Sequence, residues 1–264
     1  MIKIKVLSKP SPEEFEAVVK GMRNPMNSWK KSDYLGPHDQ NLMFRLLKAG
    51  PDHRKFMRMM NVILDIEAPL YWWKEFDTYK IGTVCNSCST MHKITAKEFT
   101  LSDFSAEHLR SNEGLDGIGS PLTLMLKTIK TLNYYRSKYI MADAKNPEQL
   151  KDYWWQLIQL LPSSYNQTRT VMISYETLHN IYYSRKGHKL DEWKDFRRFI
   201  CQERNIPLSF LITETDPITS TRSASTNSLD NTTVNSVSLT NTLNDKPETF
   251  GDVLRNDDDP FKGF

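Results

Sequence analysis

Residues 175–193 read Tyr-Glu-Thr-Leu-His-Asn-Ile-Tyr-Tyr-Ser-Arg-Lys-Gly-His-Lys-Leu-Asp-Glu-Trp. This stretch is the most informative part of the sequence for predicting the fold. Leu178, Ile181 and Tyr182 recur at the spacing of one helix face, so the first half of the stretch is predicted to be an amphipathic helix. On spacing alone, an ordinary surface helix with a solvated polar face explains this pattern.

The polar residues of the same stretch favour a second interpretation. Asn180 lies five residues before Arg185, and His188 follows Gly187, which can end the helix. An amide, a guanidinium and an imidazole in these positions could converge on one ligand at a helix end. A binding site is therefore one hypothesis, and a plain amphipathic helix is the other.

The rest of the chain up to about residue 205 shows alternating strand and helix patterns. Strands are predicted at 2–8, 62–66 and 170–173. One helix is predicted to begin at Pro12, because Ser11-Pro12-Glu13-Glu14 supplies an N-cap serine, a proline at the first helical position and a capping-box glutamate. Further helices are predicted to cover 39–49, 69–80, 121–141, 147–161 and 191–203. The small polar residues of 82–90 predict a loop.

The composition changes near residue 214, where a tail of Ser, Thr and Asn begins. Residues 214–264 hold nine acidic and four basic residues, which leaves 31 basic and 23 acidic residues in 1–213. The tail has too little apolar surface to offset its ordering entropy, so we expect it to be disordered. Residues 1–213 are expected to form one α/β domain, and their net charge of +8 suits a phosphate-bearing ligand, an anionic cofactor or a nucleic acid.

Several classes of protein are excluded by what the sequence lacks. It has no run of 18 apolar residues, so no membrane span is expected, and its N-terminus has no signal-peptide core. Three cysteines without an export signal are typical of the reducing cytoplasm, where we expect the protein. The glycine-rich patterns of P-loops and dinucleotide-binding folds are absent, as is the serine-hydrolase elbow.

Two further patterns have features of a zinc site and of a nucleic-acid site. Cys85, Cys88 and His92 have the spacing of part of a zinc site, but the sequence offers no fourth ligand, so no metal site is predicted. Aromatic and basic residues mix at 71–80 and 153–155 and could stack nucleic-acid bases. Paired tryptophans at helical spacing more often belong to a core, so a nucleic-acid partner is not expected.

Two separated segments resemble the flavin-dependent thymidylate synthases. In the first, Leu46-Leu47-Lys48-Ala49-Gly50 matches a turn of that family, Ile66-Glu67 lies in a matching strand, and Tyr79-Lys80-Ile81 falls on its Arg-His-Arg signature. The loop after that signature is matched by Asn86-Ser87, Ser89 and Met91-His92.

The second segment runs from Leu161 to Trp193 and follows the family's order of residues. The matching positions are Leu161-Pro162, Thr168, Asn180, Arg185, His188 and Glu192-Trp193. With the N-terminal strand and helix, the resemblance covers most of residues 1–205.

The resemblance implies an α/β (α+β) fold with a central, mainly antiparallel sheet and helices packed on it. It implies a methyltransferase that converts dUMP into dTMP by reductive methylation, with FAD as cofactor and with NADPH and methylene-tetrahydrofolate, a folate, as co-substrates. It also implies a homotetramer whose active sites are built from several subunits.

The resemblance also assigns roles to residues of this chain. Arg185 is expected to donate hydrogen bonds to the pyrimidine carbonyl edge, and Ser89 is expected to lie at the nucleotide, so these two are the expected catalytic residues. The expected cofactor-binding residues are Asn180, His188, Lys80 and Asn86.

The chain departs from the family's signature at several arginines. Tyr79 and Ile81 replace two of them, so that Lys80 alone keeps a positive charge there, and Met91 replaces an arginine associated with the nucleotide. A phosphate site could be rebuilt from other basic residues: Lys48, Arg54, Lys55, Arg58 or Lys74. The alternative is a catalytically inactive or repurposed nucleotide-binding or structural protein on the same fold, because each lost arginine weakens the binding of anions.

Overall fold

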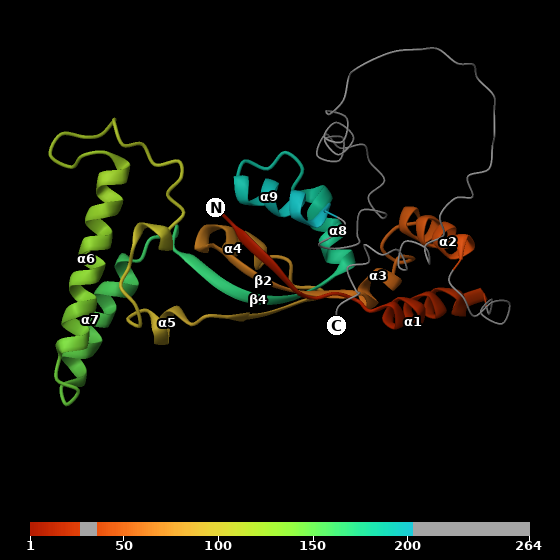
Figure 1. The fold of residues 1–264 in the computed structure, drawn as a ribbon, viewed down its shortest axis with the longest axis horizontal. Helices are drawn as coiled ribbons and strands as arrows, with labels where there is room; N and C mark the ends of the chain where they lie inside the picture. Colours follow the sequence, from red (N-terminus) through yellow and green to blue (C-terminus); the bar gives the residue numbers. More distant parts are fainter. Residues whose placement is uncertain (27–35, 203–264) are drawn as a thin grey trace, which may run out of the picture. The chain divides into compact units, whose positions relative to one another are not determined.

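The computed structural model describes residues 1–26 and 36–202 (Figure 1). The chain divides into two compact units. The first comprises Met1–Ser8, Ile63–Ile173 and Arg185–Phe196, and the second comprises Lys9–Val62, Ser174–Ser184 and the residues from Arg197. The tail of residues 214–264 lies outside the described residues, so its disorder and the domain boundary at residue 213 stay predictions.

A four-stranded sheet has the strand order β1-β2-β4-β3. Its strands are β1 (Lys3–Ser8), β2 (Asn61–Pro69), β3 (Thr83–Ser87) and β4 (Asn166–Ser174). β1 pairs antiparallel with β2, and β3 pairs antiparallel with β4. Alternate residues of β2 (Val62, Leu64 and Ile66) are fully buried, as expected for a strand with one face on a core. The mixed α/β class expected from the sequence is confirmed.

The helices of the first unit are α4 (Leu70–Phe76), α5 (Thr90–Lys93), α6 (Pro121–Met141), α7 (Pro147–Leu160) and the start of α9 (Asp191–Ile200). α6 and α7 pack along each other (Figure 1). Both begin where the sequence predicts, because the side chains of Ser120 and Asn146 accept hydrogen bonds from the backbone N–H groups of the first turn, and a proline follows each cap.

The second unit contains α1 (Pro12–Arg23), a 3-10 turn (Asn24–Met26), α2 (Pro37–Lys48), α3 (Phe56–Met59) and α8 (Tyr175–Ser184). The predicted capping box is present: Ser11 and Glu14 exchange side-chain-to-backbone hydrogen bonds at 3.2 and 2.7 Å. α3 packs against α1 and α8, and the Phe15 ring meets the buried Tyr175 ring edge-on.

The loop predicted at 82–90 is wrong, because these residues contain β3 and the start of α5. β3 is an edge strand, paired on one side from Thr83–Ile173 to Ser87–Arg169. Four of its five residues are exposed. Backbone hydrogen bonds form this strand, so the alternation of apolar and polar residues that reveals a half-buried strand is missing.

An aromatic cluster joins α4 to α9 in the first unit. Trp72 is fully buried, with its ring centre 4.7 Å from that of Trp193 and 5.7 Å from that of Phe196. Large buried aromatic side chains contribute much of the stability of a core. The cluster therefore fixes residues 185–193 beside α4, where Glu75 and Tyr79 meet them.

A second core of the first unit lies between α6, α7 and the segment after α5. Its buried members are Ile94, Phe99, Phe104, Ile129, Leu132 and Leu157. Tyr165 packs against this core and extends it to the start of β4. None of the described helices is long and apolar enough to cross a membrane.

Candidate functional site

Arg185 is held by a carboxylate and two aromatic rings. Its Nη1 donates to Glu75 Oε2 at 2.8 Å, and its Nε donates to the Tyr79 hydroxyl at 2.8 Å. The guanidinium carbon lies 4.4 Å from the centre of the Trp193 ring, within the range of a cation–π interaction. Nη2 makes no hydrogen bond within the described part of the chain, so it can still donate to a ligand.

His188 is bound to the same carboxylate. Its Nε2 lies 3.2 Å from Glu75 Oε2, which also accepts from Trp193 Nε1 at 2.8 Å. The backbone N–H of Leu190 donates to His188 Nδ1 at 3.2 Å, so the ring proton sits on Nε2, beside the carboxylate. Both ring nitrogens of His188 are therefore engaged within the first unit.

Asn180 belongs to the second unit, where its side-chain oxygen accepts a hydrogen bond from Arg54 at 2.8 Å. Arg54 and Arg58 both pair with the buried carboxylate of Glu176. Burial, and then the charge of Arg54, lowers the pKa of His179 to about 4, so this imidazole is neutral at physiological pH. Two of the basic residues that the sequence offers for a phosphate site are thus engaged by Glu176.

Ser89 lines a pocket of about 160 Å³ in the first unit. The walls come from the end of β2, from the two residues after β3, from α5 and the residues that follow it, from the turn Leu101–Asp103 and from the start of β4. The side chains around it are mostly polar, and among them are Lys93, Lys97, Asp103 and Asn166.

The Ser89 hydroxyl is bonded to an imidazole. It lies 2.8 Å from His92 Nδ1, and its oxygen accepts the backbone N–H of His92 at 3.1 Å. The direction of this hydrogen bond follows the imidazole tautomer: with the ring proton on Nε2, the hydroxyl donates to Nδ1, as in a nucleophile–base pair. From the sequence, His92 is named in an incomplete zinc site and in the loop match, with no role beside Ser89. The three-residue spacing from an N-cap serine was the signal that would have paired it with Ser89.

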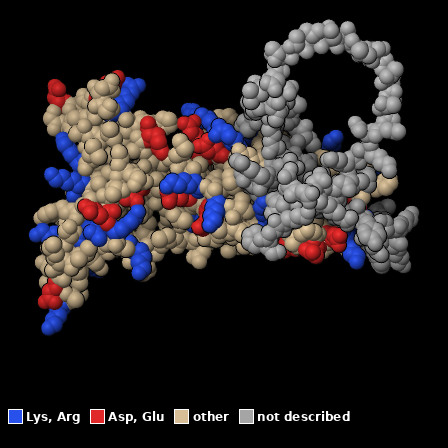
Figure 2. All heavy atoms as spheres, viewed as in Figure 1, with Lys and Arg blue, Asp and Glu red and all other residues tan. Residues whose placement is uncertain are grey.

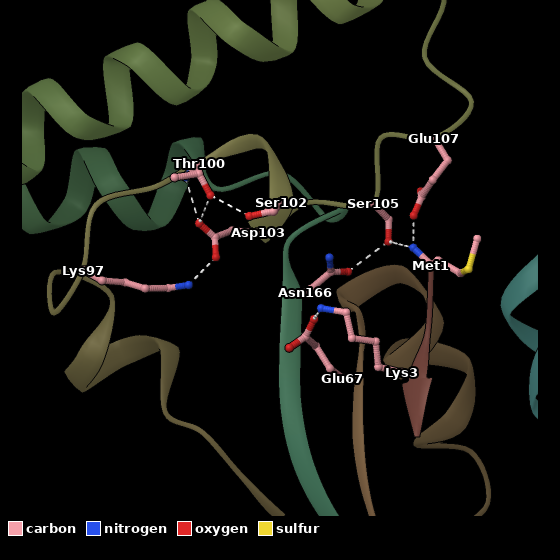
Figure 3. A network of polar contacts seen from close by, with 10 residues as sticks. All are labelled: Met1, Lys3, Glu67, Lys97, Thr100, Ser102, Asp103, Ser105, Glu107 and Asn166. Atoms are coloured by element: carbon pink, nitrogen blue, oxygen red, sulfur yellow. Dashed lines mark hydrogen bonds and ion pairs between the residues drawn. The ribbon is translucent and has the colours of Figure 1, made fainter. Parts of the chain in front are cut away.

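Lys97 and Asp103 form an ion pair at the pocket (Figure 3). The other oxygen of Asp103 accepts the backbone N–H of Thr100 at 2.8 Å. Burial alone would raise the pKa of Asp103, but the hydrogen bonds from Lys97 and Thr100 outweigh burial and lower that pKa. Both members of the pair are therefore charged at neutral pH and cancel each other.

The other acidic group of the pocket is neutralised as well, because Lys3 pairs with Glu67 at 2.6 Å (Figure 3). Lys93, in contrast, has no acidic partner within residues 1–26 and 36–202. Asn166 accepts a hydrogen bond from Ser105 at 2.9 Å, while its amide nitrogen has no hydrogen-bond partner in the described chain. The pocket thus presents one uncompensated cation and one open amide donor.

Lys80 and Asn86 are exposed, and neither side chain has a partner among the described residues. Lys80 lines a second pocket of about 190 Å³ together with Tyr79 and Thr83. In the part of the chain that the structure covers, no group of three or more His, Cys, Asp and Glu side chains is placed to hold a metal ion. On the face drawn in Figure 2, basic and acidic side chains are interspersed.

The implied flavin fits these residues in part. Lys80 and Asn86 are open and can bind an anionic cofactor, whereas His188 is already bonded to Glu75, and Asn180 to Arg54. Asn180 belongs to a different unit from the other three residues. Lys80 and Asn86 are therefore the positions at which this chain best fits the cofactor.

Comparisons with known proteins give a likeness in structure. Thymidylate synthase X from Helicobacter pylori, solved with FAD and dUMP, matches 75% of this chain and 90% of its own length, with a TM-score of 0.52 and 14% identity. The UMP/dUMP methylase PolB from Streptomyces cacaoi, solved with 5-bromo-dUMP, matches 80% of this chain and 93% of its own, with a TM-score of 0.52 and 13% identity. The sequence matches no protein-family model and no curated protein. The chain therefore has the fold of flavin-dependent thymidylate synthases.

Proposed function

We propose that this protein binds a pyrimidine nucleotide in the Ser89 pocket and methylates dUMP to dTMP, using FAD, NADPH and methylene-tetrahydrofolate. The observation that carries the proposal is a polar pocket with an open lysine on a fold whose solved examples hold dUMP and 5-bromo-dUMP. Ser89, singled out by the sequence resemblance, lines that pocket.

Two side chains act on the nucleotide in this proposal. In the tautomer that carries its ring proton on Nε2, His92 accepts a hydrogen bond from the Ser89 hydroxyl and can take up its proton when the nucleotide is bound. Arg185 donates through Nη2 to a carbonyl oxygen of the pyrimidine and stabilises the negative charge that develops there. Glu75 and Trp193 hold the guanidinium in one orientation, so little reorganisation is needed during the reaction.

The flavin, when bound, supplies the redox chemistry of the reaction. Lys80 contributes a point charge toward its phosphates, and Asn86 contributes an amide. The pocket that contains Ser89 is not lined by Arg185. We therefore propose that the complete site joins Ser89 of one copy to Arg185 of another in a homotetramer, as the sequence resemblance implies.

The experiment is an absorbance spectrum of the purified protein mixed with FAD, followed by an anaerobic assay of the reduced protein with dUMP and methylene-tetrahydrofolate. We expect a bound-flavin band, and we expect dTMP to form only when all components are present. Absence of flavin binding together with absence of dTMP would reject the enzymatic proposal.

A second candidate is a nucleotide-binding protein on this fold that has lost catalysis. The engagement of His188 by Glu75 and of Asn180 by Arg54 favours it, because two of the four expected flavin contacts are already bonded within the chain. In the same experiment it predicts dUMP binding without flavin uptake and without dUMP-dependent oxidation of reduced flavin.

A further inference from the structure

We propose that Lys93 binds the phosphate of the nucleotide and so takes the place of the arginines that this chain lacks. The inference rests on the proposed nucleotide site at Ser89 and deepens it. It also names the chemical class of the ligand, a phosphate monoester, and the end of the pocket at which the phosphate lies.

The charges that line the pocket single out this lysine. Lys97 is neutralised by Asp103, and Glu67 is neutralised by Lys3. Lys93 is the pocket cation for which the described residues provide no counterion. Lys93 lines the pocket from an exposed position, so an anion can reach its ammonium from solvent.

The position of Lys93 suits a phosphate beside Ser89. Its backbone N–H donates to the Ser89 carbonyl oxygen at 3.1 Å, so the two residues belong to one turn of chain. The open amide nitrogen of Asn166 lines the same pocket and offers a second donor. The pocket has a volume of about 160 Å³, which gives it room for several waters or for a phosphate group.

The replacement of an arginine by Lys93 cannot be recognised by comparing the signature positions alone. An arginine binds phosphate as a planar fork, which needs a fixed approach, whereas a lysine ammonium is a point charge that binds from many directions. A lysine on a neighbouring turn can therefore neutralise a phosphate without matching the arginine's place in the sequence. Lys93 lies two residues after Met91, which replaces a nucleotide-associated arginine in the resemblance.

The test compares the affinities of the full chain for dUMP and for deoxyuridine, which lacks the phosphate, by isothermal titration calorimetry. Wild type should bind dUMP at least tenfold more tightly than deoxyuridine. Lys93→Ala should weaken dUMP binding roughly tenfold to hundredfold, the range of a hydrogen bond to a charged group, and should leave deoxyuridine binding unchanged. Lys93→Arg should restore most of the dUMP affinity.

Two matched variants exclude a general effect of the substitution. Asp103→Asn should tighten dUMP binding severalfold, because it releases Lys97 from its ion pair and keeps a side-chain oxygen for the Thr100 N–H. A merely damaged pocket would not bind an anion more tightly. Lys130→Ala, at an exposed position of α6, should change neither affinity.

The outcomes separate this inference from the proposed function. Equal weakening of dUMP and deoxyuridine by Lys93→Ala, or no weakening of either, overturns the role of Lys93 while nucleotide binding stands. If wild type binds inorganic pyrophosphate through Lys93 but binds no pyrimidine nucleotide, the anion site is supported and the proposed function fails. If wild type binds none of these ligands, both are overturned.

Discussion

The segment Tyr175–Trp193 and the pocket around Ser89 treat their polar groups in opposite ways. In the segment, Glu176 is paired with two arginines, and Arg185 and His188 share the carboxylate of Glu75. In the pocket, Lys93 has no counterion among the described residues, and the Asn166 amide nitrogen has no partner there.

The segment that matches the family pattern more fully is therefore not the one whose polar groups remain available to a ligand. The segment keeps the order Asn180, Arg185 and His188, yet most of their hydrogen-bonding capacity serves the fold. The pocket around Ser89, in contrast, contains an open cation, Lys93. Pairing within the chain stabilises structure, whereas an unpaired polar group at a pocket is available to a ligand.

The largest effect should follow from removing the charge of Glu176. Glu176→Gln leaves Arg54 as a buried cation without a charged partner, so the free energy of unfolding should fall by about 3 kcal/mol or more. Urea denaturation measures it. The control Glu113→Gln removes an exposed ion pair with Arg110 and should cost less than about 1 kcal/mol. Equal effects of the two variants would contradict a structural role for the buried cluster.

Acid should weaken the same cluster through His179. Its pKa is about 4 in the folded chain and about 6.5 when unfolded, so the unfolded state takes up the proton first and stability is lost as pH falls from 6.5 to 4. The free energy of unfolding should therefore fall by about 3 kcal/mol between pH 6.5 and pH 4. His179→Gln should remove this part of the pH dependence in urea titrations. An unchanged pH profile in that variant would show that His179 does not titrate in this way.

A smaller effect is expected at Glu75, which is more exposed. Glu75→Ala removes the acceptor shared by Arg185 and Trp193, so the unfolding free energy should fall by about 1–2 kcal/mol. Lys74→Ala, at an exposed position of the same helix, should leave it within about 0.5 kcal/mol. Thermal unfolding of the two variants side by side is the measurement. If Glu75→Ala is as stable as Lys74→Ala, Arg185 is not held by this carboxylate.

The smallest effect on stability is expected in the pocket. Ser89→Ala removes a cap from a helix of four residues and should cost less than about 1 kcal/mol. The affinity for dUMP should nevertheless fall roughly fivefold or more, because a hydroxyl at the ligand is lost. Ser137→Ala, on the exposed face of α6, is the matched control in calorimetric titrations. If Ser89→Ala binds dUMP with the affinity of wild type, the nucleotide does not bind in this pocket.

Much of the fold follows from local sequence. Helix starts can be predicted at Ser11, Ser120 and Asn146, because N-capping is a contact between near neighbours in the chain. The run Val62 to Ile66 indicates a strand because it is apolar and rich in β-branched residues. β3 is missed because this edge strand of small polar residues depends on pairing with β4. That pairing joins residues between 82 (Ser87 to Arg169) and 90 (Thr83 to Ile173) positions apart in the chain.

The site is less predictable for the same reason. Ser89, Arg185 and His188 can be named from the family pattern, but Glu75 cannot be recognised as the partner of Arg185 until α4 and α9 are packed together. Likewise, Lys93 differs from Lys97 only through Asp103, a contact across a turn of chain. Charge neutralisation depends on tertiary neighbours, so the sequence alone could not separate bound cations from open ones.

The most direct test of the account is a crystal structure of the protein with 5-bromo-dUMP, in which the bromine's anomalous signal marks the pyrimidine ring. We predict that the phosphate lies within hydrogen-bonding distance of Lys93 Nζ and that the nucleotide occupies the pocket lined by Ser89. A phosphate bound at Lys80, in the pocket lined by Tyr79 and Thr83, with the Ser89 pocket empty, would contradict it.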